Sequence, residues 1–213
     1  MDDVAPVTDQ ERALYKDIDF DIPNYKNNDI GANGLIHEDD KTKLLMARWR
    51  MPSLSMHGIE GAFADPGAKT VIPSKVIGKF SIRIVPDQTV DGVHKKVTDY
   101  LNKKWAELKS PNQFRVVPHE GGRYWLADPD CPNFVAGKKA IVRAYGIEPD
   151  LTRDGCSIPI TLTLEEVTGK DVLLLPMGAC DDGAHSQNEK INLKNYIQGT
   201  KVMAAYLFEL SQM

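Results

Sequence analysis

The feature that most constrains the fold is a change of hydrophobic period in the middle of the chain. Residues 76–84 alternate in character, which places Phe80 and Arg83 on opposite faces and indicates a β-strand. Residues 93–108 instead carry apolar side chains at helical spacing, with lysines between them, and indicate an amphipathic helix. Residues 114–117 form a second short apolar run. Strand, helix and strand in this order predict a βαβ unit.

The C-terminal third has periodic segments of its own. Pro132 suits the first turn of a helix over residues 132–145, and Gly146 suits the position after its last turn. After a further short helix, the pattern predicts an apolar strand at 172–176 and a terminal helix at 193–210. These segments are typical of an α/β layer.

The N-terminal part is more polar and less regular. Thr8 and Glu11 have the spacing of a capping box at the start of a short helix, and a second helix is predicted over residues 39–50. Residues 51–73 contain several glycines and prolines and are predicted to be extended chain and loop. A connection of this length is uncommon in a compact domain unless it lines a site or an interface.

The change of character near Ala127 predicts two domains, residues 1–127 and residues 128–213. At 213 residues the chain is long enough for one large domain or two small ones.

Charge and hydropathy argue against two classes of partner. The chain has 26 basic and 30 acidic residues and no basic stripe, so we expect no nucleic-acid binding. Its longest apolar run, Val202 to Phe208, is far shorter than the ~20 residues of a membrane span. The three cysteines, Cys131, Cys156 and Cys180, have no paired spacing, which argues against disulfides and thiolate zinc sites and favours a cytoplasmic setting with small, packed thiols.

One acidic loop has the composition of a functional site. Residues 181–189 follow the predicted strand at 172–176 and place His185 among acidic and polar groups. Neutral imidazole is the commonest metal ligand in proteins, and a carboxylate usually holds its second nitrogen. The alternative is a loop histidine that hydrogen-bonds to Asp181 or Asp182, and the residues alone favour that interpretation.

Other candidates have weaker local signals. Ser157 suits either an anion contact or the N-cap of a helix, and the two interpretations are equally supported. His119 precedes a glycine pair and is within reach of a ligand if that loop borders a site, whereas His37 and His94 are expected to be solvated. His57 stays ambiguous. The sequence has no H-E-x-x-H, phosphate-loop or G-x-S-x-G motif.

Four stretches together resemble one enzyme family. They read PSLSMHGIEGAF at 52–63, KTVIP at 69–73, GKFSIR at 78–83 and DDGAHSQNEK at 181–190. They resemble the cytosolic nonspecific dipeptidase and carnosinase branch of the dinuclear zinc metallopeptidases, and the likeness covers essentially all 213 residues.

The resemblance implies a fold and a chemistry. Residues 1–127 would be the later part of a lid domain that forms a homodimer, and residues 128–213 the last part of an α/β catalytic domain. In such enzymes two divalent ions, zinc or manganese, share a water that a glutamate deprotonates for attack on the dipeptide carbonyl.

The resemblance also implies roles for individual residues. His185 matches the family's final metal ligand, and Thr70, Arg83 and Ser157 match residues that contact substrate. An arginine suits a peptide carboxylate because its planar fork binds both oxygens.

Two departures from the family pattern affect the site. Relatives have glycine where this chain has Cys156, and His119 with Glu120 shifts an imidazole by one position, which puts its expected substrate contact in doubt.

The remaining metal ligands and the glutamate base match nothing in this sequence. We therefore expect a C-terminal portion that is inactive without the N-terminal portion of the same enzyme. Isolation should also expose apolar surface and promote self-association. The alternative is a non-catalytic dimerisation module with a vestigial metal site. A small-molecule-binding regulatory domain would rest on the βαβ pattern alone.

Overall fold

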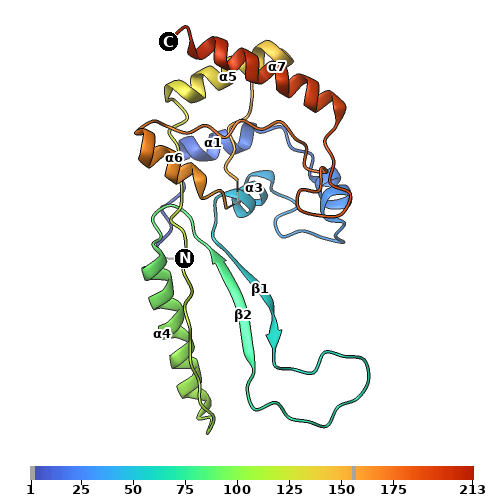
Figure 1. Ribbon diagram of the computed structural model, residues 1–213, viewed down its shortest axis with the longest axis vertical. Coiled ribbons are helices and arrows are strands. Elements are labelled where there is room, and N and C mark those ends of the chain that lie inside the picture. Colours follow the sequence, from blue (N-terminus) through green and yellow to red (C-terminus); the bar gives the residue numbers. More distant parts are fainter. Residues whose placement is uncertain (1–2, 155–156) are drawn as a thin grey trace. The chain divides into compact units, whose positions relative to one another are not determined.

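The computed structural model describes residues 3–154 and 157–213, which form two compact units (Figure 1). The first unit contains Arg50–Tyr124 together with the residues up to Pro6, and the second contains Val7–Trp49 and Trp125–Met213. The break after Tyr124 lies close to Ala127, whereas residues 7–49 group by their contacts with the C-terminal segment. The assignment of residues 1–127 and 128–213 to a lid and a catalytic domain stays a prediction.

The first unit is built on an antiparallel hairpin. Strand β1 (Ser53–Glu60) pairs with β2 (Ile77–Arg83), and a long loop joins them (Figure 1). The prediction for β2 is confirmed. The prediction of loop for residues 51–73 is wrong for β1, because those residues gain a partner in β2 that local composition does not reveal.

The hairpin has one apolar and one polar face. Leu54 lies opposite Ile82 and Met56 opposite Phe80, so the apolar side chains of the two strands share a face. The register shifts by one residue at a bulge between Met56 and Gly58, so the apolar side chains of β1 stay on the same face beyond the bulge.

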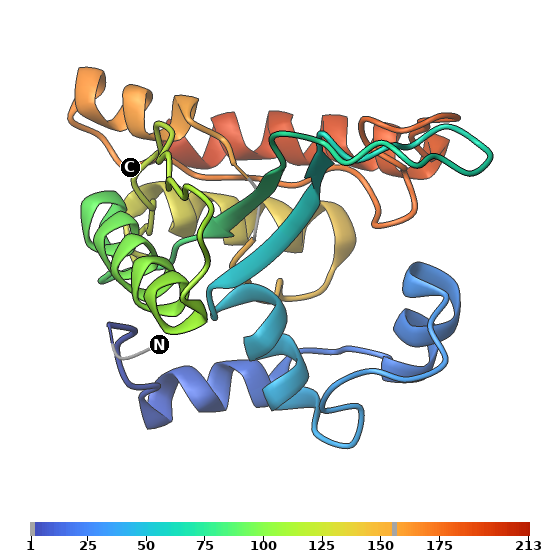
Figure 2. The same cartoon turned by 90° about the horizontal axis from the view of Figure 1, so that it is seen from below.

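Helix α4 (Val90–Leu108) follows the hairpin, as the helical period predicted. The chain then runs back along α4 (Figures 1 and 2). The Phe114 ring is stacked on Trp105 at a centroid distance of 4.8 Å. Residues 114–117 are not a strand, so the predicted βαβ unit is wrong and the observed order is β–β–α. A strand exists only through a ladder partner, and among the described residues this segment has none.

The N-terminal part of the second unit is helical. Its elements are α1 (Asp9–Asp17), α2 (Ile22–Asn24), the π-helix η1 (Tyr25–Ile30) and α3 (Lys41–Trp49). Thr8 caps α1 as predicted, its hydroxyl accepting the Glu11 N–H at 3.1 Å. Tyr15 and Ile18 pack with Leu45 and Met46 in a small buried core that holds α1 against α3.

Three further helices complete the second unit. They are α5 (Pro132–Tyr145), α6 (Ile160–Thr168) and α7 (Leu193–Leu210), and α5 and α7 have the predicted bounds. Gly146 ends α5 with a φ of 76°. The α5–α7 contact, visible in Figure 2, buries Ala136, Ala140 and Val202. None of the described helices is long and apolar enough to span a bilayer.

The segment expected to be an apolar strand, residues 172–176, is extended but unpaired. Side chains from Leu173 to Met177 alternate between half-buried and exposed, and Leu173 and Leu175 lie against Gly137 of α5. The strand prediction is therefore wrong within the described chain. The burial of side chains in this segment alternates because one side of the segment packs on α5. Among the described residues, no neighbouring strand pairs with it.

Candidate functional site

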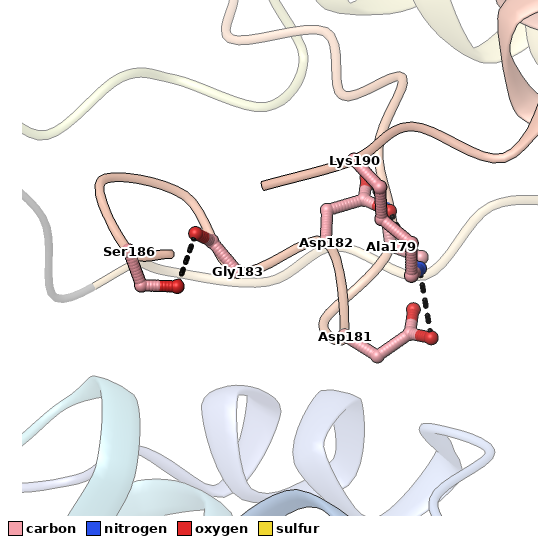
Figure 3. A network of polar contacts seen from close by, with 6 residues as sticks. All are labelled: Ala179, Asp181, Asp182, Gly183, Ser186 and Lys190. Carbon is pink, nitrogen blue, oxygen red and sulfur yellow. Dashed lines mark hydrogen bonds and ion pairs between the residues drawn. The ribbon is translucent and has the colours of Figure 1, made fainter. Parts of the chain in front are cut away.

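The acidic loop after residues 172–176 is closed at its base by ionic contacts (Figure 3). Lys190 Nζ lies 2.9 Å from Asp181 Oδ2 and 3.2 Å from Asp182 Oδ1. The Lys190 backbone N–H donates to the Asp182 carbonyl oxygen at 2.9 Å. These contacts bring the two ends of residues 181–190 together.

The tip of this loop presents His185 to solvent. The histidine has a φ of 64°, in the left-handed region that few non-glycine residues adopt. In the part of the chain that the structure describes, its imidazole makes no hydrogen bond or ion pair. The interpretation that His185 hydrogen-bonds to Asp181 or Asp182 is wrong for the described residues, in which no bond joins them and Lys190 binds both carboxylates.

The contacts at the base of the loop shift the pKa of both charged partners. The hydrogen bond from Lys190 lowers the pKa of the Asp181 carboxyl. The reciprocal bond to Asp181 raises the pKa of the Lys190 ammonium. Both groups are therefore ionised at neutral pH.

Ser157 is exposed and does not cap a helix. Helix α6 begins at Ile160 with Pro159 as its N-cap, so the N-cap interpretation of Ser157 is wrong. Cys156 lies outside the described residues. Of the other two cysteines, Cys131 is buried as expected, but Cys180 is exposed, and the expectation that it packs is wrong.

The remaining candidates lie in the first unit. Arg83 ends β2 opposite Ser53, on the face that does not carry Phe80. Thr70 is exposed in the loop between β1 and β2, and His119 is exposed in the segment that follows α4.

The polar face of the hairpin also holds a contact that the sequence did not reveal. The Nε2 atom of His57 lies 2.7 Å from the Ser81 hydroxyl, so this histidine is held across the two strands at the bulge. The only sequence signal for it was the glycine next to His57, which is typical of a strand irregularity.

The described residues do not make up a metal site by themselves. No three His, Cys, Asp or Glu side chains gather within residues 3–154 and 157–213 into a set that would hold an ion. A protein zinc site takes at least three such ligands. His185 fits the role of one ligand because its ring is exposed and unbonded, but this part of the chain does not supply a donor set for two metals.

Comparison with known proteins shows which proteins this chain resembles. The pattern of the M20 peptidase dimerisation domain matches residues 15–109. The chain is 51% identical over 204 residues to the Cys-Gly metallodipeptidase DUG1 of Saccharomyces cerevisiae. This alignment covers 96% of this chain and 42% of the yeast protein. It is 48% identical over 212 residues to the Beta-Ala-His dipeptidase of Homo sapiens, covering 100% and 41%. The chain is related to the M20 dipeptidases.

Solved structures of M20 enzymes agree with this relationship. The chain matches the yeast di-peptidase Dug1p with a TM-score of 0.90 and 50% identity, and human carnosine dipeptidase 1 with 0.89 and 47%. Each match covers 100% of this chain and 44% of the solved one. The resemblance inferred from the motifs is confirmed, and the mixed α/β fold is that of part of an M20 dipeptidase. The chain spans less than half the length of these relatives.

Proposed function

We propose that this chain is the C-terminal portion of a metal-dependent dipeptidase. The observation that carries the proposal is His185, an exposed imidazole at the tip of a closed loop that makes no hydrogen bond with the residues the structure describes. It is supported by identities of 51% and 48% to two named dipeptidases along nearly the whole chain.

In the complete enzyme two divalent ions, zinc or manganese, would polarise the scissile carbonyl and lower the pKa of the attacking water. His185 would contribute one ligand. Arg83 would bind the substrate carboxylate through its planar fork, and Thr70, Ser157 and His119 would contact the substrate beside it. Residues 15–109, which match a dimerisation domain, would join two subunits.

The proposal is tested by a chimera in which this chain replaces the matched 42% of the yeast enzyme. We expect the chimera to bind metal and hydrolyse Cys-Gly, and the chain alone to do neither, since one imidazole completes no metal site. His185→Ala should abolish turnover, whereas His94→Ala on α4 should leave it unchanged. Full activity in the His185→Ala chimera would contradict the proposal.

The second candidate is a non-catalytic dimerisation module with a vestigial metal site. The match of residues 15–109 to a dimerisation domain and the uncovered apolar face of the hairpin favour it. In that case the chimera would fold and dimerise but neither retain metal nor hydrolyse dipeptides. The same experiment therefore separates the two candidates.

A further inference from the structure

The loop that carries His185 is held by a set of contacts anchored on Asp182 (Figure 3). Its Oδ1 faces the Lys190 ammonium at 3.2 Å, and its Oδ2 accepts the Ala179 N–H at 2.8 Å. Its carbonyl oxygen accepts the Lys190 N–H at 2.9 Å. One residue thus ties the end of the loop to its beginning and to the turn before it.

The two aspartates contribute unequally to this arrangement. The Asp182 side chain is 14% exposed, while that of Asp181 is 65% exposed. Exposed ion pairs contribute little because water screens them. A Cβ atom at Gly178 would lie 2.7 Å from Asp182 Oδ2, so the carboxylate is packed closely against that glycine. Asp182 is therefore the more buried of the two partners of Lys190, although Asp181 makes the shorter contact.

Within the closed loop, Gly183 and Ser186 form a tight turn. The Gly183 carbonyl oxygen accepts the Ser186 N–H at 2.9 Å and the Ser186 hydroxyl at 2.6 Å. Gly183 has a φ of 67° and His185 a φ of 64°. A histidine in this strained region persists where surrounding contacts hold it there. The turn and the closed base supply those contacts.

We propose that Asp181, Asp182 and Lys190 are positioning residues that form an ionic clamp and fix the direction in which the loop presents His185. The proposal rests on the role of His185 as a metal ligand. A ligand is effective when neighbouring contacts hold its orientation before the metal binds. Since no acidic side chain among the described residues bonds the imidazole, the clamp acts through the backbone of the loop.

The clamp is tested on the full chain with Lys190→Met, which keeps the length of the side chain and removes its charge. We expect amide exchange at Ala179 and Ser186, measured by NMR, to become about fivefold faster, the size expected for a partly exposed ion pair. Lys190→Arg should restore the slow exchange because it keeps the charge and can donate to both carboxylates. The matched control is Lys194→Met, at an exposed lysine of α7 with no ion pair among the described residues.

Substitution of each aspartate in turn tests the clamp independently, because the two variants should differ in how much they accelerate loop exchange. Asp182→Ala should accelerate loop exchange more than Asp181→Ala, because only Asp182 also binds the Ala179 N–H. Amides of α7 report whether each variant is folded. If Asp182→Ala does not fold, the comparison of Lys190→Met with Lys190→Arg still tests whether the clamp holds the loop. Unchanged loop exchange in Lys190→Met would overturn the clamp.

The link to metal binding is tested in the chimera with the yeast enzyme. Lys190→Met should raise the zinc concentration needed for half occupancy by about fivefold, and Lys190→Arg should recover it. A loosened loop with unchanged zinc binding would overturn the positioning role. If the loop loosens but His185→Ala leaves metal content and activity intact, the proposed function fails while the clamp remains.

Discussion

At the scale of single residues, the pattern of charges around Lys190 does not show which side chains pair with one another. The sequence places two aspartates and a lysine at the ends of a ten-residue loop, and the opposite charges alone would have suggested a pairing. The local sequence instead favours the aspartates as hydrogen-bond partners of His185. The loop turns back on itself through Gly183, so the lysine reaches both carboxylates, and no other described residue bonds the imidazole.

The pKa shifts at this site predict how the loop responds to pH. The pKa of Asp181 is lowered by Lys190, so the stabilisation is present above the pKa of an unfolded aspartate and is lost as pH falls through the lowered value. The pKa of Lys190 is raised, so its contribution is complete below the pKa of an unfolded lysine and is lost as pH rises through the raised value. We expect the Asp181 carboxyl carbon shift, followed by NMR titration, to be constant around neutrality and to change in acid. Lys190→Met should move this change to higher pH, and an identical titration would contradict the prediction.

At the scale of helices and strands, local signals were sufficient for some elements and not for others. The helices at 132–145 and 193–210 were predicted with their observed bounds, because periodicity and end residues act within the helix itself. Residues 114–117 and 172–176 have the composition of strands but no ladder partner in the described chain. A strand depends on a neighbour elsewhere in the sequence, whereas a helix contains its own hydrogen bonds.

Packing on α7 gives a prediction in which two effects oppose each other. Gly199→Ala in a helix interior ordinarily stabilises by about 1 kcal/mol. Here a Cβ atom would lie 2.0 Å from Met177 Cγ, and overpacking of this kind costs about 1–3 kcal/mol. We expect a net loss of about 1 kcal/mol in the free energy of unfolding, measured with urea.

The control for this prediction removes the Met177 side chain, which would collide with the added Cβ atom. In a Met177→Ala background, Gly199→Ala should become neutral or stabilising, because the space beside α7 is then open. A gain of stability from Gly199→Ala alone would contradict the packing argument.

At the scale of the whole molecule, the chain exposes apolar surface on one face of the hairpin. On the hairpin face, Leu54, Met56 and Ile59 are 58%, 69% and 68% exposed. Contiguous apolar patches promote association. The expectation of uncovered apolar surface is confirmed, while self-association stays a prediction.

Self-association is tested by analytical ultracentrifugation of the chain and of two neighbouring variants. Met56→Lys places a charge on the apolar face and should shift the population towards monomer. Ser55→Lys adds the same charge on the opposite face and should have a smaller effect, because adjacent strand residues point to opposite sides. A strictly monomeric parent chain would contradict this prediction.

The sequence by itself determined the helices at 132–145 and 193–210, the strand at 77–83 and the relationship to M20 dipeptidases, and it proposes His185 as a metal ligand. These follow from period, end residues and local motifs, which lie within short stretches of chain. Only the tertiary structure decided that β1 pairs with β2, that residues 172–176 lie against α5, and that Lys190 holds both aspartates. Each of these joins segments separated in the sequence, and the path that brings them together is not encoded in either segment alone.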